Sequence, residues 1–331
     1  MLYTIRRGDN SVKVENVDTM KTKLPALMLG LLLIFAPHTA AQNNPSNLES
    51  QLKNHVHALS VDIGARPAGS EAETQAADYI AAQFSAWGYD VTVQEFEITG
   101  TENLTSRNVI ATGGDPNGPR IITGAHMDSV ASGTGADDNA SGVAVMLAAA
   151  ETLAGLETGY ALTFIAFGAE EIGTHGSYHY VNELDDDALA NIYLMANVDT
   201  VGSGDNFYVY AAATESDAAC NAPFATGPTW PRDLALELGE ALGHDVQTSP
   251  PHAWDGFTGP WSDHFPFAQH DVPTIYFERW NWDAGNNPCW GQETATQDIL
   301  HTKRDVFEAV EIDKMLPVAE TLIALLETVA E

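Results

Sequence analysis

Apolar positions along the chain follow two repeats, one of about 3.6 residues and one of about two. The longer repeat predicts helices near residues 46–60, 71–88, 141–155, 177–186, 230–243 and 312–330. The shorter repeat, or a continuous apolar run, predicts strands at residues 90–98, 108–114, 120–129, 161–168, 191–202 and 271–278. Strands alternating with helices are typical of a three-layer α/β/α domain with a mixed, mainly parallel central sheet.

The first 41 residues have the pattern of a leader and not of this fold. Met20 is followed by "KTK" and an apolar run, and Thr39 and Ala41 suit the small-residue rule for signal-peptide cleavage. We expect translation to start at Met20, the mature chain to start near Gln42, and export to the periplasm or the medium. An apolar run of roughly 14 residues is too short to span a membrane, so stable insertion is not expected. Residues 42–331 then form one domain.

The charge of the chain limits its partners. The 331 residues carry 14 Lys and Arg against 46 Asp and Glu, and without the leader the numbers are 9 against 43. Nucleic acid and anionic membrane surfaces are therefore not expected partners, and we expect a monomer. Two cysteines, Cys220 and Cys289, form a possible disulfide in an exported protein, although two free thiols remain an alternative.

Imidazoles and carboxylates follow several predicted strands where each strand ends. His126 and Asp128 follow one strand, Glu170 and Glu171 another, and Asp199 a third. The loop "GADDNASG" adds Asp137 and Asp138, and "WSDHFPF" adds Asp263 and His264. Because the carboxyl ends of parallel strands share one edge of a sheet, these side chains are expected to meet there. Two divalent cations would compensate so many carboxylates, and ligands without thiolate suit zinc, with manganese or cobalt as alternatives.

The motifs "GAHMDS", "GADDNASG", "FGAEEIG", "NVDTVG" and "SDHFPF" occur in this order. They resemble those of the bacterial leucyl aminopeptidase type of di-zinc exopeptidases, whose relatives include glutamate carboxypeptidases and glutaminyl cyclases. The resemblance runs from about residue 66 to the C-terminus and implies the zinc exopeptidase fold.

The resemblance also implies a role for each matching residue. One zinc ion would be bound by His126 and Asp199, and a second by Glu171 and His264. Asp138 would bridge the two ions, Asp128 would fix the His126 imidazole, and Glu170 would be the general base. The implied reaction is hydrolysis of the N-terminal peptide bond of a peptide substrate by a hydroxide that bridges the metals.

Neighbouring polar residues have simpler interpretations. We expect Asp263 to cap a helix and Asp137 to be a loop carboxylate. His175 and His179 are expected to be one surface and one packed histidine. His252, His270 and His301 are expected to be solvated or to tether loops.

A long loop rich in Trp and Gly follows the last predicted strand. Such loops are usually functional, so Glu278, Trp280, Trp282 and Asp283 are candidates for the pocket that binds the first side chain of the substrate. A similar stretch in a family member that removes basic residues implies a preference for Arg or Lys. Packing of aromatic residues in a structural loop is an equal alternative.

Three functions remain open at this point. The first is a secreted aminopeptidase. The second is a glutaminyl cyclase, which would use one zinc ion and form N-terminal pyroglutamate. The third is a catalytically silent binding module, although every ligand position that the resemblance implies is filled. Carboxypeptidase action on acidic C-termini would need cationic residues near the site, and few remain outside the leader.

Overall fold

A computed structural model describes residues 45–331 except 99, 102–103, 216–224 and 286–290. These described residues belong to one compact unit. The leader and the two cysteines, Cys220 and Cys289, lie outside the described residues. The signal peptide and the disulfide therefore stay predictions.

The described residues form a mixed sheet of nine strands. Eight strands follow the order β1-β2-β4-β3-β5-β9-β6-β7, and the ninth, β8, pairs with β6. Neighbours β3 and β4, β3 and β5, and β5 and β9 are parallel, whereas β1 with β2, β2 with β4, and β6 with β9 are antiparallel. The strands are β1 Asp90–Glu97, β2 Thr105–Gly114, β3 Arg120–His126, β4 Ala161–Phe167, β5 Ile192–Val198, β6 Asn206–Ala212, β7 Val246–Gln247, β8 Phe257–Thr258 and β9 Thr274–Trp280.

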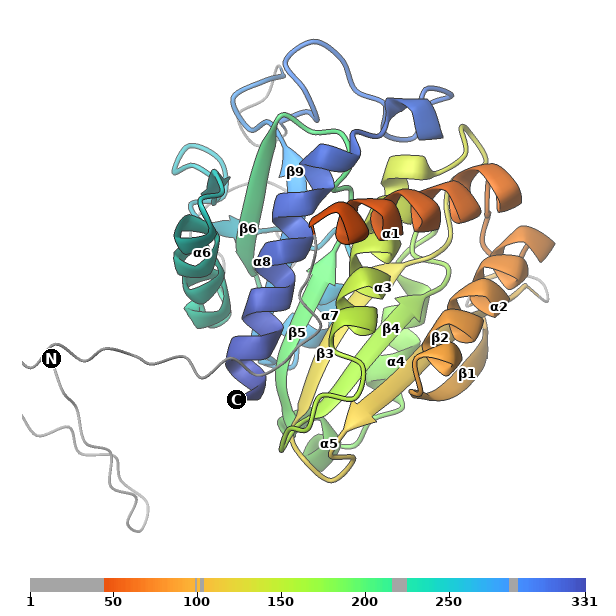
Figure 1. The fold of residues 1–331 in the computed structure, drawn as a ribbon, viewed down its shortest axis with the longest axis vertical. Coiled ribbons are helices and arrows are strands. Elements are labelled where there is room, and N and C mark those ends of the chain that lie inside the picture. Colours follow the sequence, from red (N-terminus) through yellow and green to blue (C-terminus); the bar gives the residue numbers. More distant parts are fainter. Residues whose placement is uncertain (1–44, 99, 102–103, 216–224, 286–290) are drawn as a thin grey trace, which may run out of the picture. The chain divides into compact units, whose positions relative to one another are not determined.

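Helices cover both faces of the sheet (Figure 1). One face carries α1 Pro45–His57, α2 Glu71–Ala86, α3 Gly142–Thr152, α6 Trp230–Leu242 and α8 Ile312–Ala330. The other face carries α4 His175–Asn182, α5 Asp186–Ala190 and α7 His264–Ala268. Shorter helical segments are η1 Ala58–Ile63, η2 Ala136–Ser141 and η3 Phe307–Ala309.

Side chains of the central strands enter two cores because successive residues of a strand point to opposite faces. In β4, Phe164 packs toward α2 and α3, whereas Phe167 packs toward α4 and α7. In β3, Ile121 packs in the first of these cores and Ile122 in the second. Burial on both faces explains why these strands are continuous apolar runs. The predicted three-layer fold with a mainly parallel centre is confirmed.

Two elements that position the site were not among the predicted ones. The strand β6 pairs with β9, and α7 is a helix of five residues that begins at His264. The run "NFYVYAA" in β6 is rich in aromatic and apolar residues and carries an ordinary strand signal. The segment α7 is too short to show a helical repeat.

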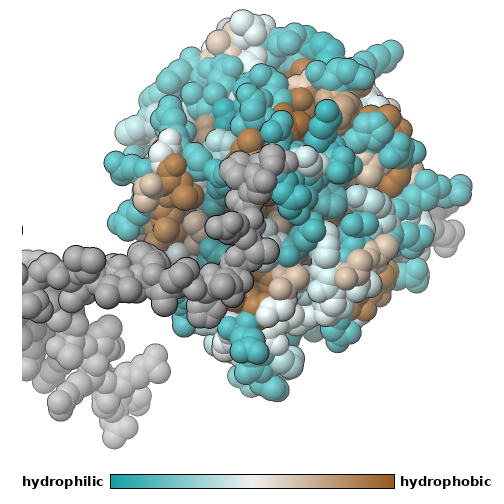
Figure 2. Space-filling view, in the orientation of Figure 1, coloured by the Kyte–Doolittle hydropathy of each residue, from teal (hydrophilic) through white to brown (hydrophobic). Residues whose placement is uncertain are grey.

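The visible surface is mostly hydrophilic, with scattered apolar patches (Figure 2). Within the described part of the chain, no helix is both long and apolar enough to cross a membrane. Exposed large apolar side chains include Ile172, which is 48% exposed and adjoins Glu171.

Candidate metal centre

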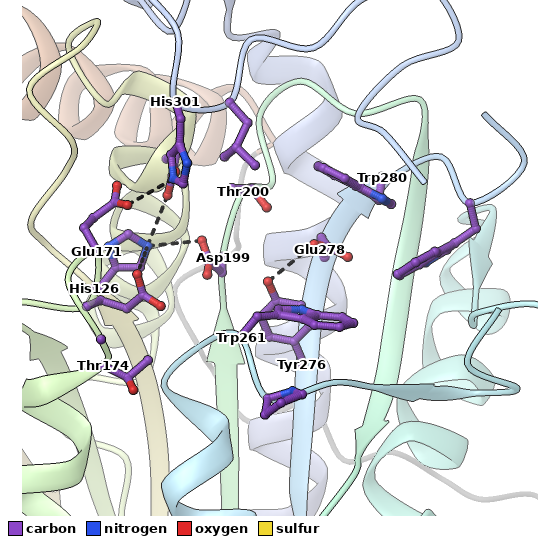
Figure 3. Close-up of a pocket in the computed structure, with 16 residues that line it drawn as sticks. His126, Glu171, Thr174, Asp199, Thr200, Trp261, Tyr276, Glu278, Trp280 and His301 are labelled. Carbon is purple, nitrogen blue, oxygen red and sulfur yellow. Dashed lines mark hydrogen bonds and ion pairs between the residues drawn. The ribbon is translucent and has the colours of Figure 1, made fainter. Parts of the chain in front are cut away.

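Three neighbouring strands bring the candidate ligands to one edge of the sheet. His126 is the last residue of β3, Asp199 directly follows β5, and Glu170 and Glu171 lie in the loop after β4. Figure 3 shows His126, Glu171 and Asp199 converging above these strand ends, with His301 approaching from the opposite side. The parallel pairing of β4, β3 and β5 is therefore what gathers side chains that are far apart in the sequence.

Asp138 lies at the centre of this group because each of its carboxylate oxygens faces a different imidazole. Its Oδ1 is 3.2 Å from His126 Nε2, and its Oδ2 is 3.1 Å from His301 Nε2. The same His126 nitrogen is 3.3 Å from Asp199 Oδ1, and the same His301 nitrogen is 3.0 Å from Glu171 Oε2. Two triads result, one of His126, Asp138 and Asp199 and the other of Asp138, Glu171 and His301.

The spacing within each triad suits a zinc ion. Bonds of about 2.0–2.1 Å in a tetrahedral arrangement place neighbouring ligand atoms about 3.3 Å apart. The four nitrogen-to-oxygen distances above, from 3.0 to 3.3 Å, agree with this value. The donors are imidazole and carboxylate groups, which zinc accepts in catalytic sites.

Asn139 fixes the loop that presents Asp138. Its side-chain oxygen accepts hydrogen bonds from the N–H groups of Gly142 and Thr200, and its amide donates to Val198 O at 2.9 Å. Because Val198 and Thr200 flank Asp199, these bonds hold Asp138 against the end of β5.

Asp128 connects His126 to the two glutamates. Its carboxylate accepts the backbone N–H of Glu170 at 3.0 Å and that of Glu171 at 3.2 Å. The His126 Nδ1 atom lies 3.2 Å from the backbone oxygen of Asp128 and 3.6 Å from its carboxylate. The expected contact with the imidazole is therefore made mainly by the main chain, and the carboxylate mainly orients the loop after β4.

Glu170 lies beside the triads without belonging to either. Its Oε2 is 4.0 Å from His126 Nε2, and it lines the same cavity. Burial raises the pKa of Glu170 well above its usual value, opposed by His126 and reinforced by Asp263 and Asp199. A raised pKa suits a carboxyl group that accepts and returns a proton.

The structure does not place His264 with the expected ligands. This residue is fully buried, its Nε2 is 3.0 Å from Gly259 O, and its ring packs on Tyr276 with centroids 4.9 Å apart. The neighbouring Asp263 stands at the N-cap position of α7, but its side chain makes no capping bond. The expected role of His264 rested on the resemblance of "SDHFPF" to a family motif, whereas the structure buries this ring against Tyr276.

His301 takes the place that the sequence analysis gave to His264. It was expected to be solvated or to tether a loop, and its side chain is indeed 54% exposed. Its Nε2 atom nevertheless completes the triad with Asp138 and Glu171. The available signal was its position in "HTKRD", at the end of the long loop that already stood out as unusual.

An aromatic cavity of about 460 Å³ opens beside the triads. Of the four expected pocket residues, Glu278, Trp280 and Trp282 line it, together with Trp261 and Tyr276 from outside that set. Figure 3 shows Glu278, Trp261, Tyr276 and Trp280 on the side of the cavity away from His126.

Asp283 does not belong to this cavity. Its side chain is 77% exposed and pairs with His252 Nε2 at 3.4 Å. Asp283 was expected to line the pocket but is absent from the residues that line this cavity. It follows Trp282 in a turn after β9, and the chain there faces the solvent.

Comparisons with known proteins agree with this geometry. The model of peptidase family M28 matches residues 108–326. The alkaline phosphatase isozyme conversion protein of Escherichia coli is 26% identical over 84% of this chain and 85% of its own length. Leupeptin-inactivating enzyme 1 of Streptomyces exfoliatus is 38% identical over 52% of this chain, and the match spans only 40% of that protein.

The solved structures that share the fold include an aminopeptidase and a glutaminyl cyclase. The zinc aminopeptidase BSAP of Bacillus subtilis has a TM-score of 0.70 at 19% identity, covering 86% of this chain and 95% of its own. The glutaminyl cyclase of Porphyromonas gingivalis has a TM-score of 0.64 at 22% identity, covering 86% of this chain and 98% of its own. The family match extends over most of the described sheet and includes both triads, and on this basis the chain belongs to peptidase family M28.

Proposed function

We propose that the chain is a zinc-dependent aminopeptidase with two zinc ions. The observation that carries this proposal is the position of Asp138, whose two oxygens each serve a complete triad of ligands. His126 and Asp199 would hold one ion, and Glu171 and His301 the other. Zinc bound in such a site acidifies a water molecule and polarises a carbonyl group.

The chain's own residues supply the proton transfers and the orientation. Glu170 is placed to take a proton from the attacking water and to return it to the leaving amine. Asp128 keeps the Glu170 backbone in place through the N–H bond described above. The free amine of a peptide N-terminus would lie beside the triads.

The first side chain of the substrate would enter the aromatic cavity. We propose that this side chain is cationic, because Glu278 lies at the cavity wall among Trp261, Trp280 and Trp282. Glu278 is buried and accepts a hydrogen bond from Tyr210 Oη at 2.8 Å. Burial raises the pKa of Glu278 to about 8, and an entering cation would favour its charged carboxylate.

The exchange Glu278→Gln tests this preference. A hydrogen bond between charged groups contributes roughly 1.5–3 kcal/mol, so kcat/KM for an Arg or Lys substrate should fall roughly 10- to 100-fold. The value for a Leu substrate should change little. The exchange Asp283→Asn is the matched control, because that carboxylate lies nearby but outside the cavity. An unchanged ratio of Arg to Leu turnover in Glu278→Gln would refute the preference.

A glutaminyl cyclase is the second candidate, favoured by the shared fold of the Porphyromonas gingivalis enzyme. We expect a cyclase to need one zinc ion, whereas both triads are complete here. A catalytically silent binding module is less well supported, because the chain has both the metal-ligating residues of the two triads and Glu170, the proposed general base.

Turnover of the chain on a panel of aminoacyl substrates and on a peptide with N-terminal Gln separates these functions. Hydrolysis that a chelator abolishes and zinc restores, with two zinc ions per chain, supports the aminopeptidase. Pyroglutamate and ammonia with one zinc ion support the cyclase, and the absence of both reactions supports a binding module.

Export and the monomeric state are also proposals. Export is supported by the pattern of Met20 to Gln42, and its check is N-terminal sequencing of the protein recovered outside the cytoplasm. Light scattering of the purified chain would give its oligomeric state.

A further inference from the structure

Glu293 lies behind the turn that presents His301. It is 1% exposed, and its Oε2 accepts the backbone N–H of Leu300 at 2.9 Å and also that of Ile299. The turn itself is closed by the N–H of Thr302, which donates to Ile299 O at 2.9 Å. The carboxylate of Glu293 therefore holds the backbone of the two residues that directly precede His301.

The other oxygen of Glu293 connects to the loop that carries Asp138. Its Oε1 is 2.6 Å from Ser203 Oγ, and the same hydroxyl contacts Asp137 Oδ2. Asp137 is also fixed by the N–H of Gly202, which donates to its Oδ1 at 2.6 Å. A continuous path of short contacts thus runs from the His301 turn through Glu293, Ser203 and Asp137 to Asp138.

The imidazole of His301 meets Asp138 and Glu171 through its Nε2 atom. Its side chain is 54% exposed, and its backbone has a φ of 56°, which is uncommon for a residue other than glycine. The position of its Nε2 atom therefore depends on the backbone of the turn. Near this turn, Glu293 is a carboxyl group that is almost fully buried and that touches neither zinc triad.

We infer that Glu293 is a positioning residue for the zinc site of Glu171 and His301, because it fixes the His301 turn relative to the Asp138 loop. The inference rests on the proposed function, since it takes His301 to be a zinc ligand. Loss of a residue that orients metal ligands typically weakens metal binding about 10- to 100-fold.

The experiment measures zinc occupancy of the full chain after dialysis against buffers of fixed free zinc. The exchange His301→Ala first identifies which of the two binding steps belongs to His301. In Glu293→Ala we expect that same step to weaken about 10- to 100-fold, and the other step to change much less. Glu293→Gln retains an oxygen for the two N–H groups and an amide for Ser203, so it should restore most of the affinity.

The matched control is Asp205→Ala, which removes a different contact to the loop between Glu293 and His301. Asp205 Oδ2 accepts the N–H of Ala295 at 2.7 Å and does not touch the His301 turn. Asp205→Ala should leave both zinc steps unchanged. If Glu293→Ala does not fold, Ser203→Ala takes its place, because it cuts the link to Asp137 and should weaken the same zinc step.

The outcomes separate the inference from the proposed function. A wild-type chain that binds fewer than two zinc ions would refute the proposed function itself. If the wild-type chain binds two, unchanged zinc steps in Glu293→Ala, or in Ser203→Ala where that variant replaces it, would overturn the inference alone. Equal weakening of both steps would also overturn it, because a general loss of stability does not select one site.

Discussion

Asp138 and Asp128 show how single carboxylates organise the site. Asp138 divides its two oxygens between two imidazoles, and Asp128 divides its two oxygens between the N–H groups of Glu170 and Glu171. Both residues are buried, so water cannot readily replace a lost partner of their carboxylate oxygens. Loss of one of these contacts would therefore cost free energy. The resemblance to the di-zinc exopeptidases implied a supporting role for Asp128 at the imidazole, whereas its carboxylate supports the loop of Glu170 and Glu171.

The two histidines give a direct comparison at the residue scale. We predict that His301→Ala retains only one zinc ion per chain, because it removes a donor from one triad. His264→Gln should retain both ions, because His264 Nε2 is directed to Gly259 O. Zinc content by atomic emission, measured beside circular dichroism of each variant, checks this. Loss of zinc in His264→Gln with the native spectrum preserved would restore His264 as a ligand.

His55 gives a prediction about pH that is independent of the zinc site. Burial lowers its pKa to about 4, and its Nδ1 atom lies 2.7 Å from Tyr79 Oη of α2. In the unfolded chain His55 has a pKa near 6.5, so it takes up a proton there before it does so in the folded chain. The free energy of unfolding that this group contributes above pH 6.5 is therefore lost as the pH falls toward about 4.

The expected size follows from the pKa difference. Between about pH 7 and pH 5 this group should lower the free energy of unfolding by about 2 kcal/mol. His55→Gln retains a polar partner for Tyr79 and should lose that part of the pH dependence. Urea unfolding of both proteins at the two pH values measures it, and identical pH dependence would refute the assignment.

At the scale of elements, the sequence allowed the central strands to be predicted well. β3, β4 and β5 are buried on both faces, so their apolar runs are unambiguous, and the polar residues at their ends mark the site. The segments that carry Trp261, His264 and His301 are loops or very short helices. The directions of their side chains depend on tertiary contacts, which cannot be predicted from a repeat in the sequence. This is why His264 was expected as a ligand in the place that His301 takes.

The start of α2 illustrates a local signal that does specify structure. Ser70 Oγ accepts the N–H of Glu73 at 3.1 Å, as expected for a helix N-cap. We predict that Ser70→Ala lowers the free energy of unfolding by about 1 kcal/mol, whereas Ser70→Asp changes it by a few tenths. Thermal and urea unfolding measure both variants. Equal stability of Ser70→Ala and the wild type would show that the cap contributes nothing.

At the scale of the whole molecule, an acidic surface surrounds a site that is itself rich in carboxylates. The formal net charge is −32, and the visible face is mostly hydrophilic (Figure 2). Such a field favours the approach of cations, which include zinc and basic peptides, and disfavours polyanions. The net charge of the molecule and the buried Glu278 therefore favour the same class of substrate.

The central claim is that two zinc ions and Glu170 act together on a peptide bond. The most direct test is to measure zinc content and turnover on the same sample of wild-type chain and of Glu170→Gln. We predict two zinc ions in both proteins, and turnover about 10²- to 10⁴-fold lower in the variant, because general acid and base catalysis is lost while the triads remain. Full turnover by a Glu170→Gln chain that holds two zinc ions would contradict the account.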